Sequence, residues 1–262
     1  MNDSTIYANA TNGWNAISSP TRLWADGAAR NLSTALAALD KAHPGRIAGV
    51  QLVGVSGEWM MPAMAAHTDP ASGFVGDYTP QMQKEFCAAE RRNDPHASTK
   101  CVLPSAIERN APTLGNTMMQ WNSSDDSAAR AFRMNRFLSD STASAISITS
   151  AAVKNTSAGA ALTVAFYGYL FSLSDTRLTG SGHLSLGSVL NDKNLDMIAS
   201  PWQYRDSARQ RGGAMTVHGP IDSVNNHNQK IWAIEDDTYL FRSILMQSKD
   251  QLGTGILCSY DC

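Results

Sequence analysis

Residues 228–237 read NQKIWAIEDD, a short apolar run that leads directly into three consecutive acids. The residues from Ile231 to Ile234 are apolar on both faces and partly β-branched, which is typical of a strand buried in a parallel sheet. Two interpretations of the acids are open. Either the chain leaves the core there and the carboxylates face water, or one of them does chemistry at the mouth of a barrel.

Strand and helix patterns alternate along the rest of the chain. Three more buried strands are expected, at 46–55, 161–171 and 195–200. Helical patterns stand around them, at 28–43, 77–92, 128–156 and 238–250, with shorter ones at 181–191 and 221–226. Residues 1–28 show no clear period and are expected to form an N-terminal loop segment. This alternation predicts the α/β class with parallel βαβ units, whose functional residues collect at the carboxyl ends of the strands.

Bulk composition indicates an ordinary globular protein. The chain has 262 residues, of which 43% are apolar and 17% charged, and its formal net charge is -2. Such a charge excludes the basic surfaces that hold nucleic acid or an anionic membrane. No apolar run reaches the length of a membrane span. The N-terminus lacks the basic and apolar regions of a secretory signal, and the compartment stays open.

The four cysteines are Cys87, Cys101, Cys258 and Cys262. They show no metal-ligand spacing and no clustering with histidines, so we expect no zinc or other metal. Cys87 and Cys101 are expected to be free thiols.

Two glutamates stand at strand ends. Glu58 follows the first expected strand and Glu235 ends the fourth. In a closed eight-stranded barrel this offset places the two side chains across the mouth from each other. Retaining glycoside hydrolysis needs two carboxyl groups about 5 Å apart, one as acid/base and one as nucleophile. The acid needs a raised pKa, which an aromatic wall such as Trp59 supplies by desolvation. The alternative for each glutamate is a solvated loop residue.

Several short motifs occur in an order and spacing that resemble a known family. They are GVSGEWMM (54–61), DYTPQMQKEF (77–86), PSAIERN (104–110), FYGY (166–169), SGH (181–183), SP (200–201) with Tyr204, RGG (211–213), DS (222–223) and KIWAIEDD (230–237). Together they resemble the catalytic barrel of proteins related to the β-galactosidases of glycoside hydrolase family 42.

The resemblance implies a (β/α)8 TIM-type barrel in which the acid/base ends the fourth strand and the nucleophile ends the seventh. Glu58 matches the acid/base and Glu235 the nucleophile, so the expected strands correspond to strands four to seven. The implied substrate-binding residues are Trp59, Tyr167, Tyr169, His183, Tyr204 and Arg211. Aromatic faces would stack on the sugar, and polar tips would hold its hydroxyl groups.

Other interpretations of these residues stay open. His183 is equally expected as a helix cap or a core residue. Tyr167 and Tyr169 alternate on an expected strand and therefore point the same way, either into a pocket or into packing.

The sequence also departs from the family pattern. Gly57 stands where related proteins commonly carry Asn before the acid/base, and Tyr239-Leu240 stands where an Arg-Thr pair is usual. The first three strands and the eighth are missing, so residues 1–262 are expected to form a single, incomplete barrel domain. Unpaired strand edges favour pairing with another chain, here as a homo-oligomer.

Two functional hypotheses follow. The first is a retaining O-glycosyl hydrolase of the β-galactosidase-like kind, which acts on a carbohydrate and needs no cofactor. The alternative is a catalytically inactive, truncated relative that binds carbohydrate or has no activity. A third and weaker hypothesis is an unrelated half-barrel interaction protein.

Overall fold

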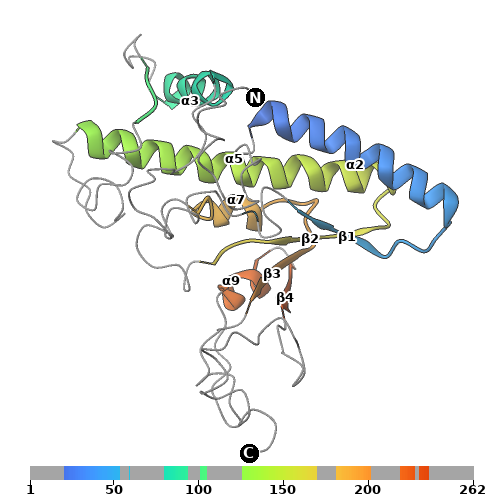
Figure 1. Cartoon of the computed structure of the whole chain (residues 1–262). Helices are drawn as coiled ribbons and strands as arrows, with labels where there is room; N and C mark the ends of the chain where they lie inside the picture. The colour runs from blue at the N-terminus through green and yellow to red at the C-terminus, as the bar shows by residue number, and fades with distance from the viewer. Residues whose placement is uncertain are drawn as a thin grey trace, which may run out of the picture.

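A parallel sheet and the helices around it form the centre of the computed structural model (Figure 1). The structure describes residues 21–53, 59, 80–93, 101–104, 126–169, 181–201, 219–227 and 230–235. Within these residues the strands are β1 (Gly49–Leu52), β2 (Leu162–Phe166), β3 (Met197–Pro201) and β4 (Ile231–Glu235). The helices are α2 (Arg22–Ala42), α3 (Pro80–Asn93), α5 (Asp126–Thr156), α7 (Leu186–Leu190) and α9 (Ile221–Asn225).

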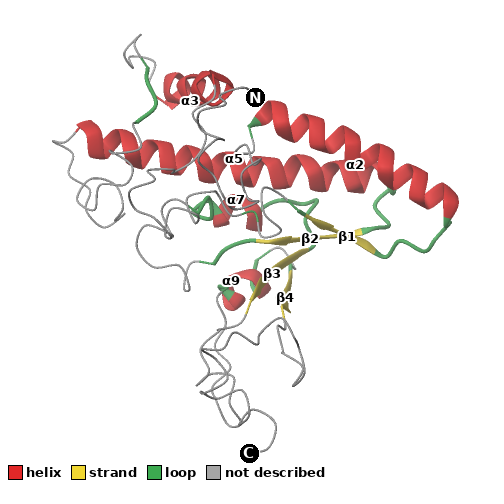
Figure 2. Ribbon diagram, viewed as in Figure 1, coloured by secondary structure: helices red, strands yellow, loops and turns green. Residues whose placement is uncertain are grey.

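The four strands are parallel and lie side by side in chain order, β1-β2-β3-β4. All four strands expected from the sequence are therefore present, although β1 and β2 are shorter than their apolar runs. Connections between neighbouring parallel strands are right-handed. When each strand is added on the same side of the one before it, the connecting helices therefore all lie on one face of the sheet. Figure 2 shows α2, α5 and α7 together on one side of the sheet.

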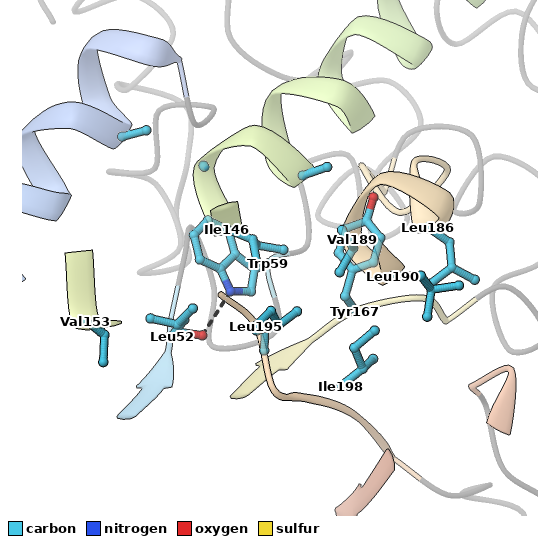
Figure 3. Packing of buried hydrophobic residues seen from close by; sticks show 14 of the residues in the cluster. Leu52, Trp59, Ile146, Val153, Tyr167, Leu186, Val189, Leu190, Leu195 and Ile198 are labelled. Carbon is cyan, nitrogen blue, oxygen red and sulfur yellow. Dashed lines mark hydrogen bonds between the residues drawn. The ribbon is translucent and has the colours of Figure 1, made fainter. Parts of the chain in front are cut away.

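The helix-covered face of the sheet forms the main core. Leu52, Ala165 and Ile198 stand next to one another in the register of β1, β2 and β3. They belong to the same buried cluster as Ile146 and Val153 of α5 (Figure 3). Full burial of an aliphatic side chain of this size contributes about 1.5–3 kcal/mol, so this layer holds the sheet to α5.

The opposite face of the sheet is less buried, although Ala199 and Pro201 of β3 are buried on it. Because side chains alternate along a strand, this face carries the strand residues between the core positions. We call it the open face, and it comprises Gly49, Gln51, Leu162, Val164, Phe166, Met197, Ala199, Pro201, Ile231, Ala233 and Glu235. Leu162 is 46% exposed and Ile231 is 51% exposed, whereas the neighbouring core positions Ala165 and Ile198 are fully buried.

Helix α2 begins earlier than its pattern predicts, and its first turn is capped twice. Thr21 is the N-cap, and its hydroxyl accepts a hydrogen bond from the Trp24 amide at 3.2 Å. Glu85 of α3 accepts the amides of Arg22 and Leu23 at 2.7 and 3.3 Å. Residues 22–28, expected in the N-terminal loop segment, therefore belong to this helix, because two partners satisfy its amides.

The leucines of α2 are only partly buried. Leu36 is buried, but Leu39 is 53% exposed. The buried residues of α2 include Ala25 instead, near the start of the helix. Trp24 and Leu32 pack against the same cluster as Leu36.

A second, smaller core lies between α3 and the first half of α5. It contains Met82 and Phe86 of α3 with Met134 and Leu138 of α5. Here Cys87 and Cys101 form a disulfide with an S–S distance of 2.02 Å, so the expectation of free thiols is wrong. A spacing of 14 residues matches no local motif, and only packing of the chain brings the two sulfur atoms together.

Two of the expected helices are not found over their full expected ranges in the described residues. The helix expected over 181–191 is confined to α7, because Gly182 takes a φ of 84° and residues 181–185 are not helical. The helix expected over 238–250 lies outside the described residues.

Candidate active site

The carboxyl ends of the four strands meet along one edge of the sheet. Residues 167–169 follow β2 there, while β3 ends at Pro201 and β4 at Glu235. Trp59 reaches the end of β1, because its indole contacts Leu52. Functional side chains of parallel α/β sheets gather at this edge, which makes it the candidate site.

Glu235 is the last residue of β4 and lies on the open face. It pairs in register with Pro201 of β3 and is partly exposed. Three other candidate residues for catalysis and sugar binding, Glu58, Tyr204 and Arg211, lie outside the described residues. Glu235 is therefore the described member of the expected carboxylate pair.

Trp59 is fixed in the main core. Its side chain is fully buried, and its indole Nε1–H donates to the Leu52 carbonyl at 2.9 Å (Figure 3). The ring meets Trp24 of α2 edge-on, with centroids 6.1 Å apart. Its backbone has a φ of 57°, which costs a bulky residue about 1–3 kcal/mol. The core contacts hold this conformation in place and tie the chain after β1 to the helices.

Tyr167, Tyr169 and His183 form one buried cluster. The His183 ring stacks on Tyr167 with centroids 4.5 Å apart and meets Tyr169 edge-on at 4.9 Å. Both tyrosines therefore contact the same imidazole. The three side chains are buried, which places them inside the protein and not on an exposed wall.

His183 is anchored by backbone amides. Its Nδ1 accepts the N–H groups of Gly168 at 3.1 Å and Tyr169 at 3.3 Å. A ring nitrogen that accepts carries no proton, so the imidazole is neutral with its hydrogen on Nε2. The histidine thus fixes the loop at the end of β2.

Gly168 makes this arrangement possible. Its φ of 90° is a conformation that other residues rarely adopt. A Cβ at this position would lie 3.1 Å from Leu186 Cδ1 and 3.5 Å from Pro220 Cδ. The strand expected over 161–171 therefore stops at Phe166, and the backbone turns so that the next two amides face His183.

The Tyr167 hydroxyl links the same loop to the segment before α7. It donates to the Gly182 carbonyl at 2.8 Å and accepts the Ser185 amide at 3.2 Å. Burial raises the pKa of the Tyr167 phenol, so it stays protonated over the whole working range of pH. Tyr167 therefore acts through uncharged hydrogen bonds, which hold the loop after β2 against the segment before α7.

The opposite edge of the sheet holds a charged network that the sequence reading did not single out. Lys154 of α5 contacts Asp196 with N and O 2.6 Å apart, and Asp196 also accepts the Thr163 amide at 2.8 Å. The Lys230 ammonium donates to the carbonyls of Asp192 and Leu195, both at 2.5 Å. A lysine placed directly before a buried strand, in NQKIWAIE, is the sequence signal by which this network could have been found.

The pKa shifts in this network follow from burial and pairing. Burial raises the pKa of Asp196, but hydrogen bonds from Lys154 and Thr163 outweigh it and leave the pKa below its ordinary value. Burial lowers the pKa of Lys230, against the attraction of Asp192 and Asp196. Because these groups lie at the amino ends of the strands, we assign them to stability.

The described ranges contain no group of three or more histidines, cysteines or acids placed to hold a metal ion. None of the helices within those ranges combines the length and apolar character that crossing a membrane requires.

Comparisons with known proteins leave the family open. No protein-family model matches the chain, and no curated protein or solved structure is significantly similar to it.

Proposed function

We propose that the chain is a retaining O-glycosyl hydrolase of the β-galactosidase-like kind, with Glu235 as nucleophile and Glu58 as acid/base. In this proposal the described strands are part of a (β/α)8-type barrel, and the substrate is a carbohydrate. Two carboxyl groups are sufficient for the reaction, so the mechanism needs no cofactor and no metal.

The position of Glu235 carries the proposal. It ends β4 at the carboxyl edge of a parallel sheet, on the face away from the helices. In a barrel that face is the interior, where the mouth residues converge on substrate. β1, which leads toward Glu58, lies three strands away in the same sheet. That spacing suits two carboxyl groups on either side of one glycosidic bond.

The reaction would proceed in two steps. The Glu235 carboxylate attacks the anomeric carbon while the Glu58 carboxylic acid protonates the departing glycosidic oxygen, which gives a covalent glycosyl-enzyme. Glu58, now a carboxylate, takes a proton from water, and the resulting hydroxide displaces Glu235 from the sugar. The configuration at the anomeric carbon is retained.

The buried aromatic residues support the site indirectly. Trp59 fixes the chain after β1, and His183 with Tyr167 fixes the loop after β2. Tyr204 and Arg211 remain the proposed sugar contacts.

Covalent trapping tests the proposal most directly. The chain is incubated with 2-deoxy-2-fluoro glycosides that carry a good leaving group, and its peptides are analysed by mass spectrometry. We expect one added fluorosugar, on Glu235. Attachment at another carboxylate, with turnover of aryl glycosides intact, would exclude the assigned nucleophile.

A matched pair of variants complements the trap. Glu235→Gln removes the nucleophile and is expected to lower turnover of an aryl glycoside by at least about 1,000-fold. Asp40→Asn removes an exposed carboxylate of α2 and is expected to leave turnover unchanged. Equal activity of the two variants would contradict the proposal.

The burial of the aromatic cluster favours a second candidate, an inactive relative that binds carbohydrate or has no activity. Trp59, Tyr167 and His183 have no exposed surface on which a sugar could stack. Under this alternative Glu235 is not trapped and hydrolysis is absent in the unmodified chain. Calorimetric titration with monosaccharides then separates binding from complete inactivity.

A further inference from the structure

Helix α3 is held in the second, smaller core by aromatic and covalent contacts. Phe86 meets Phe137 of α5 edge-on with ring centroids 5.6 Å apart. The disulfide joins Cys87 of α3 to Cys101, and Leu103, two residues further on, is buried in the same core. Isolated helices of about 12–15 residues are marginal in water, so the 14-residue α3 depends on these contacts for its position.

Helix α3 in turn supplies a cap to α2. The Glu85 carboxylate, two residues before Cys87, accepts the amides of Arg22 and Leu23 at 2.7 and 3.3 Å. Gln81, one turn earlier in α3, donates to Glu85 Oε1 at 2.6 Å and helps to orient the carboxylate. The first amides of a helix have no partner within the helix, and a negative charge is favourable at that end. A displacement of α3 would therefore remove a cap from α2.

The first turn of α2 leads on to the main core beside the candidate site. Trp24 is the third residue of α2, and its ring meets the Trp59 ring edge-on at 6.1 Å. The Trp59 indole is in turn bonded to the Leu52 carbonyl at the end of β1. Trp59 directly follows Glu58, the proposed acid/base, in the sequence. A continuous series of contacts thus runs from the disulfide through α3 and α2 to Trp59.

The disulfide lies where a reductant can reach one of its two cysteines. Cys87 is 7% exposed, whereas Cys101 is partly exposed and its neighbour Val102 is 59% exposed. A dithiol reductant would attack the Cys101 sulfur as a thiolate, and Cys87 would leave and take up a proton. The second thiol of the reductant then displaces Cys101, which also takes up a proton. The protein gains two electrons and two protons, and the dithiol becomes a disulfide.

We propose that the Cys87–Cys101 disulfide is a redox-sensitive tether that controls the first turn of α2 and, through it, the packing of Trp59. In the oxidised chain α3 keeps Glu85 on the α2 amides. In the reduced chain α3 loosens, the cap is lost, and the contact between Trp24 and Trp59 weakens. The inference does not rest on the proposed function, because its readouts are structural and involve no turnover.

Hydrogen exchange of the full chain tests the tether. A Cys258→Ser, Cys262→Ser background leaves Cys87 and Cys101 as the cysteines that respond to dithiothreitol. On reduction we expect the protection of the amides of Arg22 and Leu23 to fall by about tenfold or more. The last turn of α2, at Leu39–Ala42, and strand β2 should change by less than about twofold. Reoxidation should restore the protection.

Two variants of α3 separate the cap from the rest of the helix. Glu85→Ala removes the cap and should lower the protection of the first turn of α2 by about tenfold even in the oxidised chain, so that reduction adds less than about twofold. Glu90→Ala is the matched control, because Glu90 pairs with Arg133 of α5 and not with α2. It should keep the full response to dithiothreitol. Circular dichroism verifies that both variants are folded.

The indole N–H signal of Trp59 tests the far end of the series. It is identified in nitrogen-15 spectra by its loss in Trp59→Phe. Its exchange with solvent should accelerate by about threefold or more on reduction in the background chain, and by less than that in Glu85→Ala.

Four outcomes overturn the proposal. One is protection at Arg22 and Leu23 that reduction leaves unchanged, which would make the disulfide a local staple of α3. A second is an equal loss of protection over α2 and β2, which would indicate general destabilisation. The third is a full response to reduction in Glu85→Ala, and the fourth is an indole signal of Trp59 that does not respond.

Discussion

The two edges of the sheet use polar groups in opposite ways. At the amino edge, charges are paired at short range, with Lys154 on Asp196 and Lys230 on two carbonyls. At the carboxyl edge, neutral aromatic rings and backbone amides fix the loops around His183, and Glu235 ends β4 on the open face. The charges at the amino edge stabilise the fold, whereas the carboxyl edge holds a carboxylate at the end of a strand. The partners of a charged side chain near a strand end therefore have to be known before a function is assigned to it.

Removal of the buried cation at the amino edge has the largest expected effect on stability. Lys230→Met leaves the carbonyls of Asp192 and Leu195 without the ammonium and should lower the free energy of unfolding by about 2–3 kcal/mol. Lys193→Met, at an exposed position nearby, is the matched control and should change it by less than about 0.5 kcal/mol. Urea unfolding measures both. Equal stability of the two variants would show that the network contributes nothing.

A side chain at the turn after β2 tests the carboxyl edge. Gly168→Ala requires a positive φ and brings a Cβ to 3.1 Å from Leu186, so we expect a loss of about 2 kcal/mol. Gly187→Ala, in α7 with no atom within 4 Å of the added Cβ, should be neutral or stabilising by up to about 1 kcal/mol. Thermal unfolding followed by circular dichroism separates the two. A Gly168→Ala variant as stable as Gly187→Ala would rule out the strained turn.

Loss of the Asp196 carboxylate has the smallest expected effect on the free energy of unfolding, and this effect depends on pH. Its folded pKa is lowered, so the carboxylate stabilises the fold above the unfolded pKa, and that contribution disappears as the pH falls through the folded pKa. Asp196→Asn should cost about 1 kcal/mol near pH 7. The difference from the unmodified chain should shrink progressively below about pH 4. Urea midpoints from pH 2 to 7 measure it, and a difference independent of pH would contradict the assignment.

The sequence predicts the elements of the sheet better than their ends. Apolar runs mark all four strands, and Glu235 lies at a strand end as expected. The apolar run continues past Phe166 through Tyr167 and Tyr169, but β2 ends at Phe166 because the backbone turns at Gly168. Hydrophobic periodicity does not reveal a backbone dihedral angle. The disulfide between Cys87 and Cys101 depends in the same way on tertiary packing.

The candidate site is less predictable than the sheet. An aromatic residue beside a candidate acid suggests a pocket wall, yet Trp59 is held in the core by Leu52 and Trp24. Tyr167 and Tyr169 were expected to share one direction, and both contact His183 although they lie beyond the strand. Burial is a property of the assembled layers, so residue type and spacing alone do not determine it.

The pairing of β1 with β2 also sets an order of events during synthesis. Gly49 pairs with Leu162, so β1 leaves the ribosome long before its partner, and all of α5 must be added in between. At ordinary translation rates this interval lasts about ten seconds. During that time β1 has no β2 to pair with, and it can pair instead with segments of other nascent chains on the same messenger RNA. Production of this protein in soluble form should therefore respond to slower initiation of translation, or to a chaperone that shields extended segments, before it responds to any change at the candidate site.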